Sequence, residues 1–367
     1  MNIILLTSSR ADYGIYLPLL KKLKSDSFFK IKIVVFGTHL SEKYGKTINQ
    51  IFNDGFEVHY QIETLLDADS PEKIAKSMAL TIDKFASLWA KEKSNIDLIL
   101  CLGDRYEMFA AVSASVPFNI AAAHLHGGET TMGAIDNVFR HSITSMSKLH
   151  FASTANHAKR IEQILGSKED VYNVGALSLD NLNDIKLLTV QEFYEKFNIQ
   201  LQQPILVTFH PETVAYEKNE YCADELIAAL NTIDKQILIT MPNADTMGSV
   251  IRNKLIEFAD KKTNVITVES LGTEGYFSCL NHCSFVLGNS SSGIIEAASF
   301  GKYVLNLGNR QLGRDVGNNV IHCEISKMKI IEAVQLINKL PKLNNENIYG
   351  NGKTGDKIIT VLKNFFK

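Results

Sequence analysis

Residues 3–36 read IILLTSSRADYGIYLPLLKKLKSDSFFKIKIVVF, and this stretch decides the fold class. Residues 3–7 predict a strand, residues 16–24 a helix and residues 31–36 a second strand. Short apolar runs of this kind are typical of parallel strands that are covered on both faces. Since parallel strands are joined by right-handed crossovers, the stretch predicts the first strand–helix–strand unit of an α/β domain.

The same alternation continues almost to the end of the chain. It pauses at residues 175–189, which are rich in Asn, Asp and Leu, and it restarts at Pro204. We therefore expect two doubly wound α/β domains, residues 1–177 and 178–353, and a terminal helix over residues 354–367. The other strand-like runs are residues 98–102, 120–124, 171–174, 205–209, 236–240, 264–268, 285–287 and 303–307, and helical stretches include residues 71–93, 136–147, 224–233 and 246–260.

Length and composition exclude several classes of protein. The 367 residues are enough for two domains, and a hydrophobic content of 45% excludes wholesale disorder. Lys and Arg number 38 against 40 Asp and Glu, so the net charge of −2 gives no general basic surface for nucleic acid or an anionic membrane. The first apolar run is too short for a signal peptide, and none reaches the ~18–20 residues of a membrane span. We expect a cytoplasmic protein without nucleic-acid or membrane partners.

Metal and disulfide chemistry are not indicated. The five cysteines are odd in number and scattered, with no CxxC pair, which is typical of reduced thiols in the cytosol. His124 and His126 are two residues apart, so their side chains would point to opposite faces of a strand. We therefore predict no metal site.

Polar residues follow the strand-like runs of the first half. In parallel α/β sheets, ligands bind outside the carboxyl ends of the strands. Arg10 lies in the loop after the first strand, where a guanidinium can hold an anion at a helix start. Asp104 and Arg105 follow residues 98–102, and Glu129 follows a Gly-Gly pair that lets backbone approach a ligand closely. Taken alone, Arg10 also fits a solvated side chain, and Asp104 also fits a helix N-cap with Arg105 as its partner.

A third carboxylate of the first half is Asp136, at the start of a predicted helix. Arg140 is four residues further on, so the two side chains are expected to be neighbours on one helix face. An exposed ion pair is the simplest interpretation. The short distance in sequence from Glu129 favours a place for Asp136 in the same site.

The second half carries a different set of residues after its strands. Residues 288–296 are small and rich in hydroxyl groups and open a helix, so the N–H groups, hydroxyls and helix dipole together suit a diphosphate. Glu296 could accept hydrogen bonds from ribose hydroxyls, and Arg310 could clamp a phosphate. The other candidates at strand ends are His210, Asn243, Ser290 and Ser291. This division suggests sugar chemistry in the first half and nucleotide binding in the second.

Eight of these loops, in this order, resemble the hydrolysing UDP-N-acetylglucosamine 2-epimerases of sialic- and legionaminic-acid synthesis. The resemblance covers most of the chain and implies a glycosyltransferase-B-like fold, in which two Rossmann-like domains face a cleft and the last helix packs back on the first domain. It also implies a homodimer without metal or other cofactor. The motifs are RADYG (10–14), GDRYE (103–107), HGGE (126–129), RHSIT (140–144), HPET (210–213), NADT (243–246), GNSSSG (288–293) and GNRQ (308–311).

The resemblance implies a reaction and a set of site residues. UDP-N-acetylglucosamine and water would give UDP and N-acetylmannosamine through a 2-acetamidoglucal intermediate, which would feed the synthesis of nonulosonic acids. By motif position the catalytic carboxylates are Asp104, Glu129 and Asp136, and which of them serves which face of the sugar stays open. The positions implied for substrate binding are Arg10, Arg105, His210, Asn243, Ser290, Ser291, Glu296 and Arg310.

Three alternatives stay open beside this first expectation. The same reaction on UDP-N,N'-diacetylbacillosamine would give 2,4-diacetamido-2,4,6-trideoxymannose, and the rather apolar residues 130–135 would suit a sugar without a 6-hydroxyl. A glycosyltransferase of the same fold would require an acceptor. A two-domain sugar-binding protein would need no carboxylates clustered in its loops. Ile15 stands where the non-hydrolysing relatives carry a Lys, which favours release of a free sugar.

Overall fold

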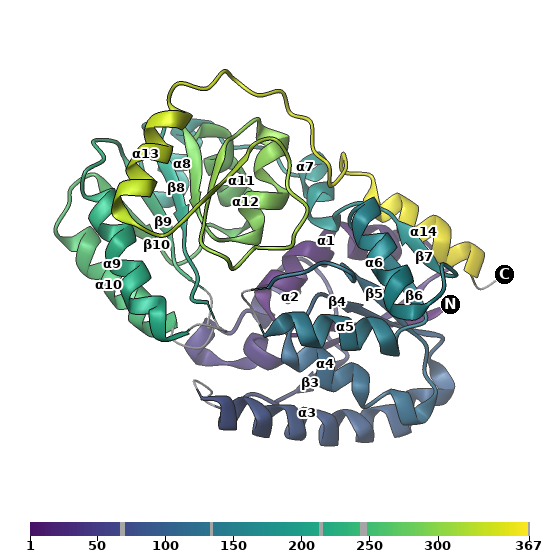
Figure 1. The fold of residues 1–367 in the computed structure, drawn as a ribbon. Coiled ribbons are helices and arrows are strands. Elements are labelled where there is room, and N and C mark those ends of the chain that lie inside the picture. The colour runs from purple at the N-terminus through teal and green to yellow at the C-terminus, as the bar shows by residue number, and fades with distance from the viewer. Residues whose placement is uncertain (67–69, 133–134, 213–215, 243–247, 366–367) are drawn as a thin grey trace. The chain divides into compact units, whose positions relative to one another are not determined.

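The computed structural model describes residues 1–66, 70–132, 135–212, 216–242 and 248–365. The chain divides into two compact units (Figure 1). Unit 1 contains residues 1–129, 135–183 and 349–367, and unit 2 contains residues 130–134 and 184–348. Each unit is built on one parallel sheet, which confirms the predicted α/β class with two doubly wound sheets.

Unit 1 has a seven-stranded parallel sheet in the order β3-β2-β1-β4-β5-β6-β7. Successive residues of β1 point to opposite faces: Ile3 and Leu5 join one apolar core, and Ile4 and Leu6 join the other. Helices therefore cover both faces of the sheet, as its apolar strands predict. The strands are β1 (Asn2–Thr7), β2 (Lys30–Phe36), β3 (Tyr60–Ile62), β4 (Leu98–Leu102), β5 (Ala122–Leu125), β6 (Leu149–Ala152) and β7 (Val171–Asn173).

The helices of unit 1 divide between these two cores. The core that contains Ile3 is closed by α1 (Arg10–Ser25), α2 (Ile48–Asn53) and α14 (Thr354–Phe365). The core that contains Ile4 is closed by α3 (Pro71–Glu92), α4 (Tyr106–Ser113) and α5 (Asp136–Met146). The helix α6 (Ala155–Leu165) packs beside β6 and β7 at the edge of the sheet. The last helix of the chain therefore belongs to the unit that contains the first strand (Figure 1).

Unit 2 has a six-stranded parallel sheet in the order β10-β9-β8-β11-β12-β13. One of its faces is covered by α9 (Asn219–Leu230), α10 (Gly248–Asp260) and α13 (Lys327–Ile337). On the other face, Gly293 of α12 (Ser291–Ile295) approaches Val286 and Val304, and α8 (Val190–Phe197) contacts α11 (Gly272–His282). The strands are β8 (Ile205–Thr208), β9 (Ile237–Thr240), β10 (Val265–Val268), β11 (Phe285–Gly288), β12 (Val304–Leu307) and β13 (Val320–Cys323).

The strand order places the loops that carry polar residues. In unit 1 the order reverses between β1 and β4, and in unit 2 it reverses between β8 and β11. Loops that follow such neighbouring strands diverge and leave room for a ligand. In the part of the chain that the structure describes, no helix has both the length and the apolar composition needed to cross a bilayer.

Candidate active site

The loop after β4 presents Asp104 and Arg105. Gly103 adopts a φ of +78°, which turns the chain away from the strand. The helix α4 then begins at Tyr106, so Arg105 and not Asp104 occupies the N-cap position. Arg105 donates from Nε and Nη2 to both carboxylate oxygens of the buried Glu107, at 3.2 and 3.0 Å. The alternative of Asp104 as a helix cap is therefore wrong, and Arg105 has a bidentate partner that the sequence did not predict.

Arg140 of α5 connects the first two predicted carboxylates. Its side chain is buried, its Nη2 forms an ion pair with Asp104, and its Nη1 lies 3.6 Å from Glu129 Oε2. The same Nη1 donates to the backbone oxygen of His126 at 2.7 Å. The expected exposed ion pair is wrong for Arg140, because the loops after β4 and β5 enclose it. Asp136 lies half-buried at the first position of α5, one turn before Arg140.

Glu129 is buried and accepts two hydrogen bonds on one oxygen. His126 Nδ1 lies 2.7 Å from Oε1, and Ser153 Oγ donates to Oε1 at 2.8 Å. Ser153 directly follows β6, and its Oγ lies 2.9 Å from Nδ1 of His157 on α6. Residues from two consecutive strand–helix segments, β5–α5 and β6–α6, therefore surround this carboxylate.

His124 supports the loop of Asp104 from inside the sheet. Its Nε2 lies 2.8 Å from the Gly103 carbonyl oxygen and its Nδ1 lies 3.1 Å from Thr144 Oγ1. Burial lowers the pKa of His124 to about 3, so the ring is neutral at pH 7 and donates to the Gly103 oxygen. His124 and His126 have different partners, and His126 lies just beyond the end of β5 with a φ of +62°. Among the described residues, no group of three or more His, Cys, Asp or Glu side chains is arranged to hold a metal ion.

The start of α1 places Arg10 after a network of short polar side chains. Ser9 caps the helix, since its Oγ accepts from the Asp12 backbone N–H at 3.3 Å. The Asp12 carboxylate accepts from the Ser8 N–H and hydroxyl at 3.0 and 2.7 Å. Arg10 is exposed at the first position of the helix, beside the positive end of its dipole.

In unit 2, Asn289 connects two of the predicted residues. Its side chain accepts from the His210 N–H at 2.7 Å and donates to the His210 oxygen at 2.8 Å. Its own backbone oxygen accepts from Arg310 Nη1 at 3.2 Å and from Gln311 Nε2 at 2.8 Å. Gly288, just before it, has a φ of +139° and passes so close to β8 that a Cβ would lie 2.0 Å from the Thr208 oxygen.

The remaining predicted residues of unit 2 lie around the same loop. Ser290 takes the N-cap position of α12, Ser291 is its first residue, and the buried Glu296 directly follows it. Asn243 lies outside the described residues.

The structure thus joins Asp104 to Glu129 through Arg140, and His210 to Arg310 through Asn289. The roles of Arg140, Asn289, Ser153 and His157 were missed, because each depends on contacts between separate loops.

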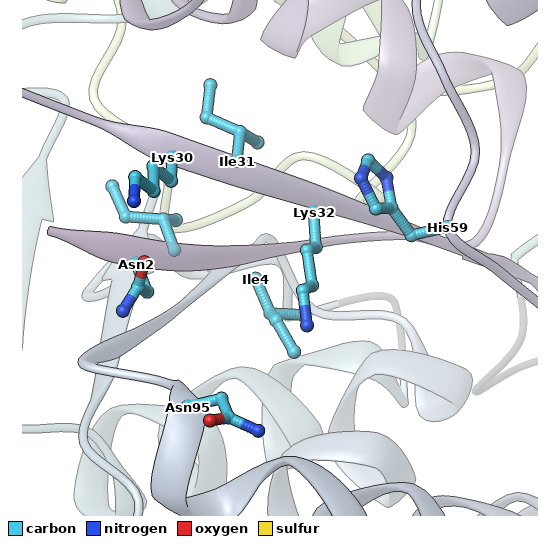
Figure 2. A pocket seen from close by; sticks show the side chains of 8 residues that line it. Asn2, Ile4, Lys30, Ile31, Lys32, His59 and Asn95 are labelled. Carbon is cyan, nitrogen blue, oxygen red and sulfur yellow. The ribbon is translucent and has the colours of Figure 1, made fainter. Parts of the chain in front are cut away.

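A pocket of about 190 Å³ lies elsewhere in unit 1 (Figure 2). It is lined by the first residues of β1 and β2, with His59 and Asn95, so it lies at the amino ends of the strands. Lys32 in this pocket is already paired with the buried Glu92 at 2.6 Å. The pocket contains none of the predicted site residues, and those of unit 1 follow the carboxyl ends of its strands, at the opposite edge of this sheet.

Comparison with known proteins identifies the family to which this sequence is similar. The model of the UDP-N-acetylglucosamine 2-epimerase family matches residues 21–363. A UDP-N,N'-diacetylbacillosamine 2-epimerase (hydrolyzing) of Legionella pneumophila is 34% identical over 99% of this chain and 95% of its own. The polysialic acid biosynthesis protein P7 of Escherichia coli is 33% identical over 91% of this chain and 85% of its own. A GDP/UDP-N,N'-diacetylbacillosamine 2-epimerase (hydrolyzing) of Campylobacter jejuni is 33% identical over 89% and 85%.

The fold is also found in a solved structure. The UDP-GlcNAc 2-epimerase of Neisseria meningitidis, crystallised with UDP-GlcNAc, superposes with a TM-score of 0.82 over 99% of this chain and 100% of its own. The two sequences are 18% identical in that superposition, so the likeness establishes the shared fold.

Proposed function

Because the chain belongs to the UDP-N-acetylglucosamine 2-epimerase family, we propose that it converts a UDP-linked 2-acetamido sugar and water into UDP and the free 2-epimer of that sugar. The observation that carries the proposal is the pair of carboxylates Asp104 and Glu129, which meet the two terminal nitrogens of one buried guanidinium. Acid–base chemistry at a carbon needs such groups held in place by the fold.

The proposed reaction has two steps. First, a carboxylate removes the proton from carbon 2, the bond between carbon 1 and the UDP oxygen breaks, and a double bond forms between carbons 1 and 2. Water then adds its oxygen to carbon 1, and a proton reaches carbon 2 from the opposite face. Two faces require two differently placed acid–base groups. Asp104 and Glu129 come from separate loops and meet this requirement, with Asp136 as a third carboxylate.

For binding of the UDP-sugar substrate we propose the residues that the resemblance implies. Asn289 supports this assignment because it follows β11 and bonds both the backbone of His210, after β8, and the guanidinium of Arg310, after β12, the strands on either side of β11. Both side chains could offset the charge of the departing diphosphate. The full proposed set is Arg10, Arg105, His210, Asn243, Ser290, Ser291, Glu296 and Arg310.

We propose UDP-N,N'-diacetylbacillosamine as the first substrate to test and UDP-N-acetylglucosamine as the second. The order reverses the one that the sequence favoured, because relatives at 34% and 33% identity carry the diacetylbacillosamine name. The relative P7 is named for polysialic acid synthesis, so UDP-N-acetylglucosamine stays a candidate substrate. Either product would feed nonulosonic acid synthesis. The rather apolar residues 130–135, which follow Glu129 in the sequence, suit a sugar with a methyl group at carbon 5. We further propose a cytoplasmic homodimer.

The test is nucleotide release from each sugar with no acceptor present. We expect UDP and a free 2-epimer from at least one of the two UDP-sugars, and Asp104→Asn and Glu129→Gln should abolish both products while the protein stays folded. A GDP-linked sugar belongs in the same series, since the Campylobacter relative is named for both nucleotides. If UDP appears only after a sugar acceptor is added, the enzyme is a transferase and the proposal is wrong.

A further inference from the structure

We infer that Ser153 and His157 are positioning residues for Glu129: they form a buried hydrogen-bonded chain that orients its carboxylate and favours its ionised form. The inference rests on the proposed acid–base role of Glu129. No motif of the sequence singles out either residue, and both lie beyond the loops that carry the family resemblance.

The hydrogen-bonded chain from Glu129 to His157 is continuous and shielded from solvent. Ser153 Oγ donates to Glu129 Oε1 at 2.8 Å, and His157 Nδ1 lies 2.9 Å from the same Oγ. Glu129, Ser153 and His157 are each about 1% exposed. At this depth a hydrogen bond is not weakened by competing water, so each link has a large effect on its neighbour.

The available protons determine which group donates and which accepts in each hydrogen bond around Glu129. The Ser153 hydroxyl has one proton, which it gives to Glu129, so its oxygen accepts the proton of His157 Nδ1. On the other side, the Leu177 N–H points at His126 Nε2 at 3.4 Å, which leaves Nδ1–H of His126 to donate to Glu129 Oε1. Oε1 therefore receives two donors. A carboxylate accepts both, whereas a proton on Oε1 would oppose them, so the arrangement favours the anion.

The two carboxylate oxygens of Glu129 face different groups. Oε1 is held by Ser153 and His126, and Oε2 faces Arg140 Nη1 at 3.6 Å. A carboxylate that rotated freely would lose this orientation.

The start of α6 fixes the position of His157 in the hydrogen-bonded chain. Thr154 caps the helix and accepts from the His157 N–H at 3.2 Å, which sets His157 on its first turn. Gly128 has a φ of +72°, and a Cβ there would lie 2.2 Å from the His157 oxygen. Arg160 Nη1 donates to the Gly128 oxygen at 3.2 Å. Among the described residues, the charged and titratable groups near the hydrogen-bonded chain include His126, Arg140, Arg160 and Tyr349, with Asp104 beyond Arg140.

Matched variants test the inference through kinetics. Ser153→Ala removes the donor to Glu129, and we expect kcat to fall about 10- to 100-fold with little change in KM. Ser153→Thr keeps the hydroxyl and should stay within about threefold of the wild type. His157→Asn, which keeps an N–H near the position of Nδ1, should likewise exceed His157→Leu in kcat. The exposed Ser145→Ala is the control, with no expected effect.

The pH dependence separates positioning from general structural damage. Loss of a donor disfavours the ionised form of Glu129, so the acid limb of kcat/KM should move to higher pH in Ser153→Ala and stay in place in Ser153→Thr. Equal losses in Ser153→Ala and Ser153→Thr, or an unmoved acid limb in both, would overturn the inference.

A measurement without substrate keeps the inference separate from the proposed function. Long-range proton–nitrogen NMR spectra of the folded full chain report which ring nitrogen of each histidine carries the proton. We expect His157 to carry it on Nδ1, and its ring signals to move in Ser153→Ala and in Glu129→Gln. A proton on Nε2 of His157, or His157 ring signals that stay unchanged in both variants, would refute the hydrogen-bonded chain. A wild type that cleaves no nucleotide sugar would instead refute the proposed function.

Discussion

Arg140 and Asp104 form an ion pair that joins α5 to the loop after β4, and the same guanidinium lies beside Glu129 on the loop after β5. Two loops at the carboxyl edge of one sheet are thus connected through a side chain from a third element. Since Arg140 is about 2% exposed, its charge is compensated by these carboxylates and by the His126 oxygen.

Removing this guanidinium should affect both folding and catalysis. Arg140→Met leaves two carboxylates without their partner, so the free energy of unfolding should fall by about 3 kcal/mol and kcat by at least about 100-fold. Arg140→Lys supplies one point charge in place of a fork and should recover stability better than activity. Urea denaturation and nucleotide release measure the two effects. An Arg140→Lys enzyme with wild-type kcat would contradict the proposed role.

Asn289 should matter for the nucleotide rather than for the sugar chemistry. Asn289→Ala removes both bonds to the His210 backbone, and we expect the Kd for UDP to rise about tenfold because the His210 loop is no longer fixed to the loop after β11; the bond of Arg310 to the Asn289 backbone oxygen remains. Isothermal titration calorimetry measures this Kd. Asn264→Ala is the matched control, since Asn264 also bonds a backbone oxygen, that of Lys235, at the other edge of the same sheet. Equal affinities in the two variants would count against the assignment.

The stability of the fold should decrease in mild acid. Burial lowers the pKa of His124 to about 3, and of His39 and His150 to about 4. The unfolded chain binds a proton at each position near pH 6.5 and the folded chain does not, so stability is complete above that pH and falls as the pH drops towards about 4. Each histidine adds a slope of up to about 1.4 kcal/mol per pH unit.

Urea titrations at about pH 7.5 and about pH 5 test this dependence. His124→Gln removes one of the three groups and should flatten the slope, although the loss of its bonds to Gly103 and Thr144 also lowers stability at neutral pH. A free energy of unfolding that stays constant between the two pH values would disprove the prediction.

The attachment of α14 to unit 1 should depend on Asp180. This buried carboxylate accepts from the backbone N–H groups of Thr354 and Gly355 at 2.8 and 2.7 Å, the first two residues of the helix. Asp180→Ala should lower the free energy of unfolding by about 1–3 kcal/mol and speed amide exchange in α14. Asp356→Ala, which removes an exposed ion pair with Lys22, should cost less than about 1 kcal/mol. Unchanged exchange in Asp180→Ala would be incompatible with this role.

The sequence predicted the strands of the two cores better than those at the sheet edges. Residues 3–7 and 98–102 are continuous apolar runs, and they form the adjacent central strands β1 and β4. The edge strands β3 and β13 were missed, because Tyr60–Ile62 has three residues and Val320–Cys323 is partly exposed. The strand β6 was missed because His150 interrupts its short apolar run, although the structure buries that ring.

The candidate site was predictable only as far as single loops determine it. Asp104 and Glu129 follow strands, and parallel strands bring their carboxyl ends to one edge, so their common location could be expected. The burial of Arg140 could not, because its spacing from Asp136 fits an exposed pair equally well. Ser153 gains its contact with Glu129, and His157 its link to Glu129 through Ser153, from the pairing of β5 with β6, which no local pattern encodes.

Proton NMR of the reaction in deuterated water, with UDP-N,N'-diacetylbacillosamine and UDP-N-acetylglucosamine in separate tubes and no acceptor, tests whether the protein is a hydrolysing epimerase. We predict released UDP and a free 2-epimer with one deuterium at carbon 2, because the proton removed in the first step is replaced from solvent. A free sugar that keeps its original proton and configuration at carbon 2, or two UDP-sugars that stay intact, would contradict hydrolysing epimerisation.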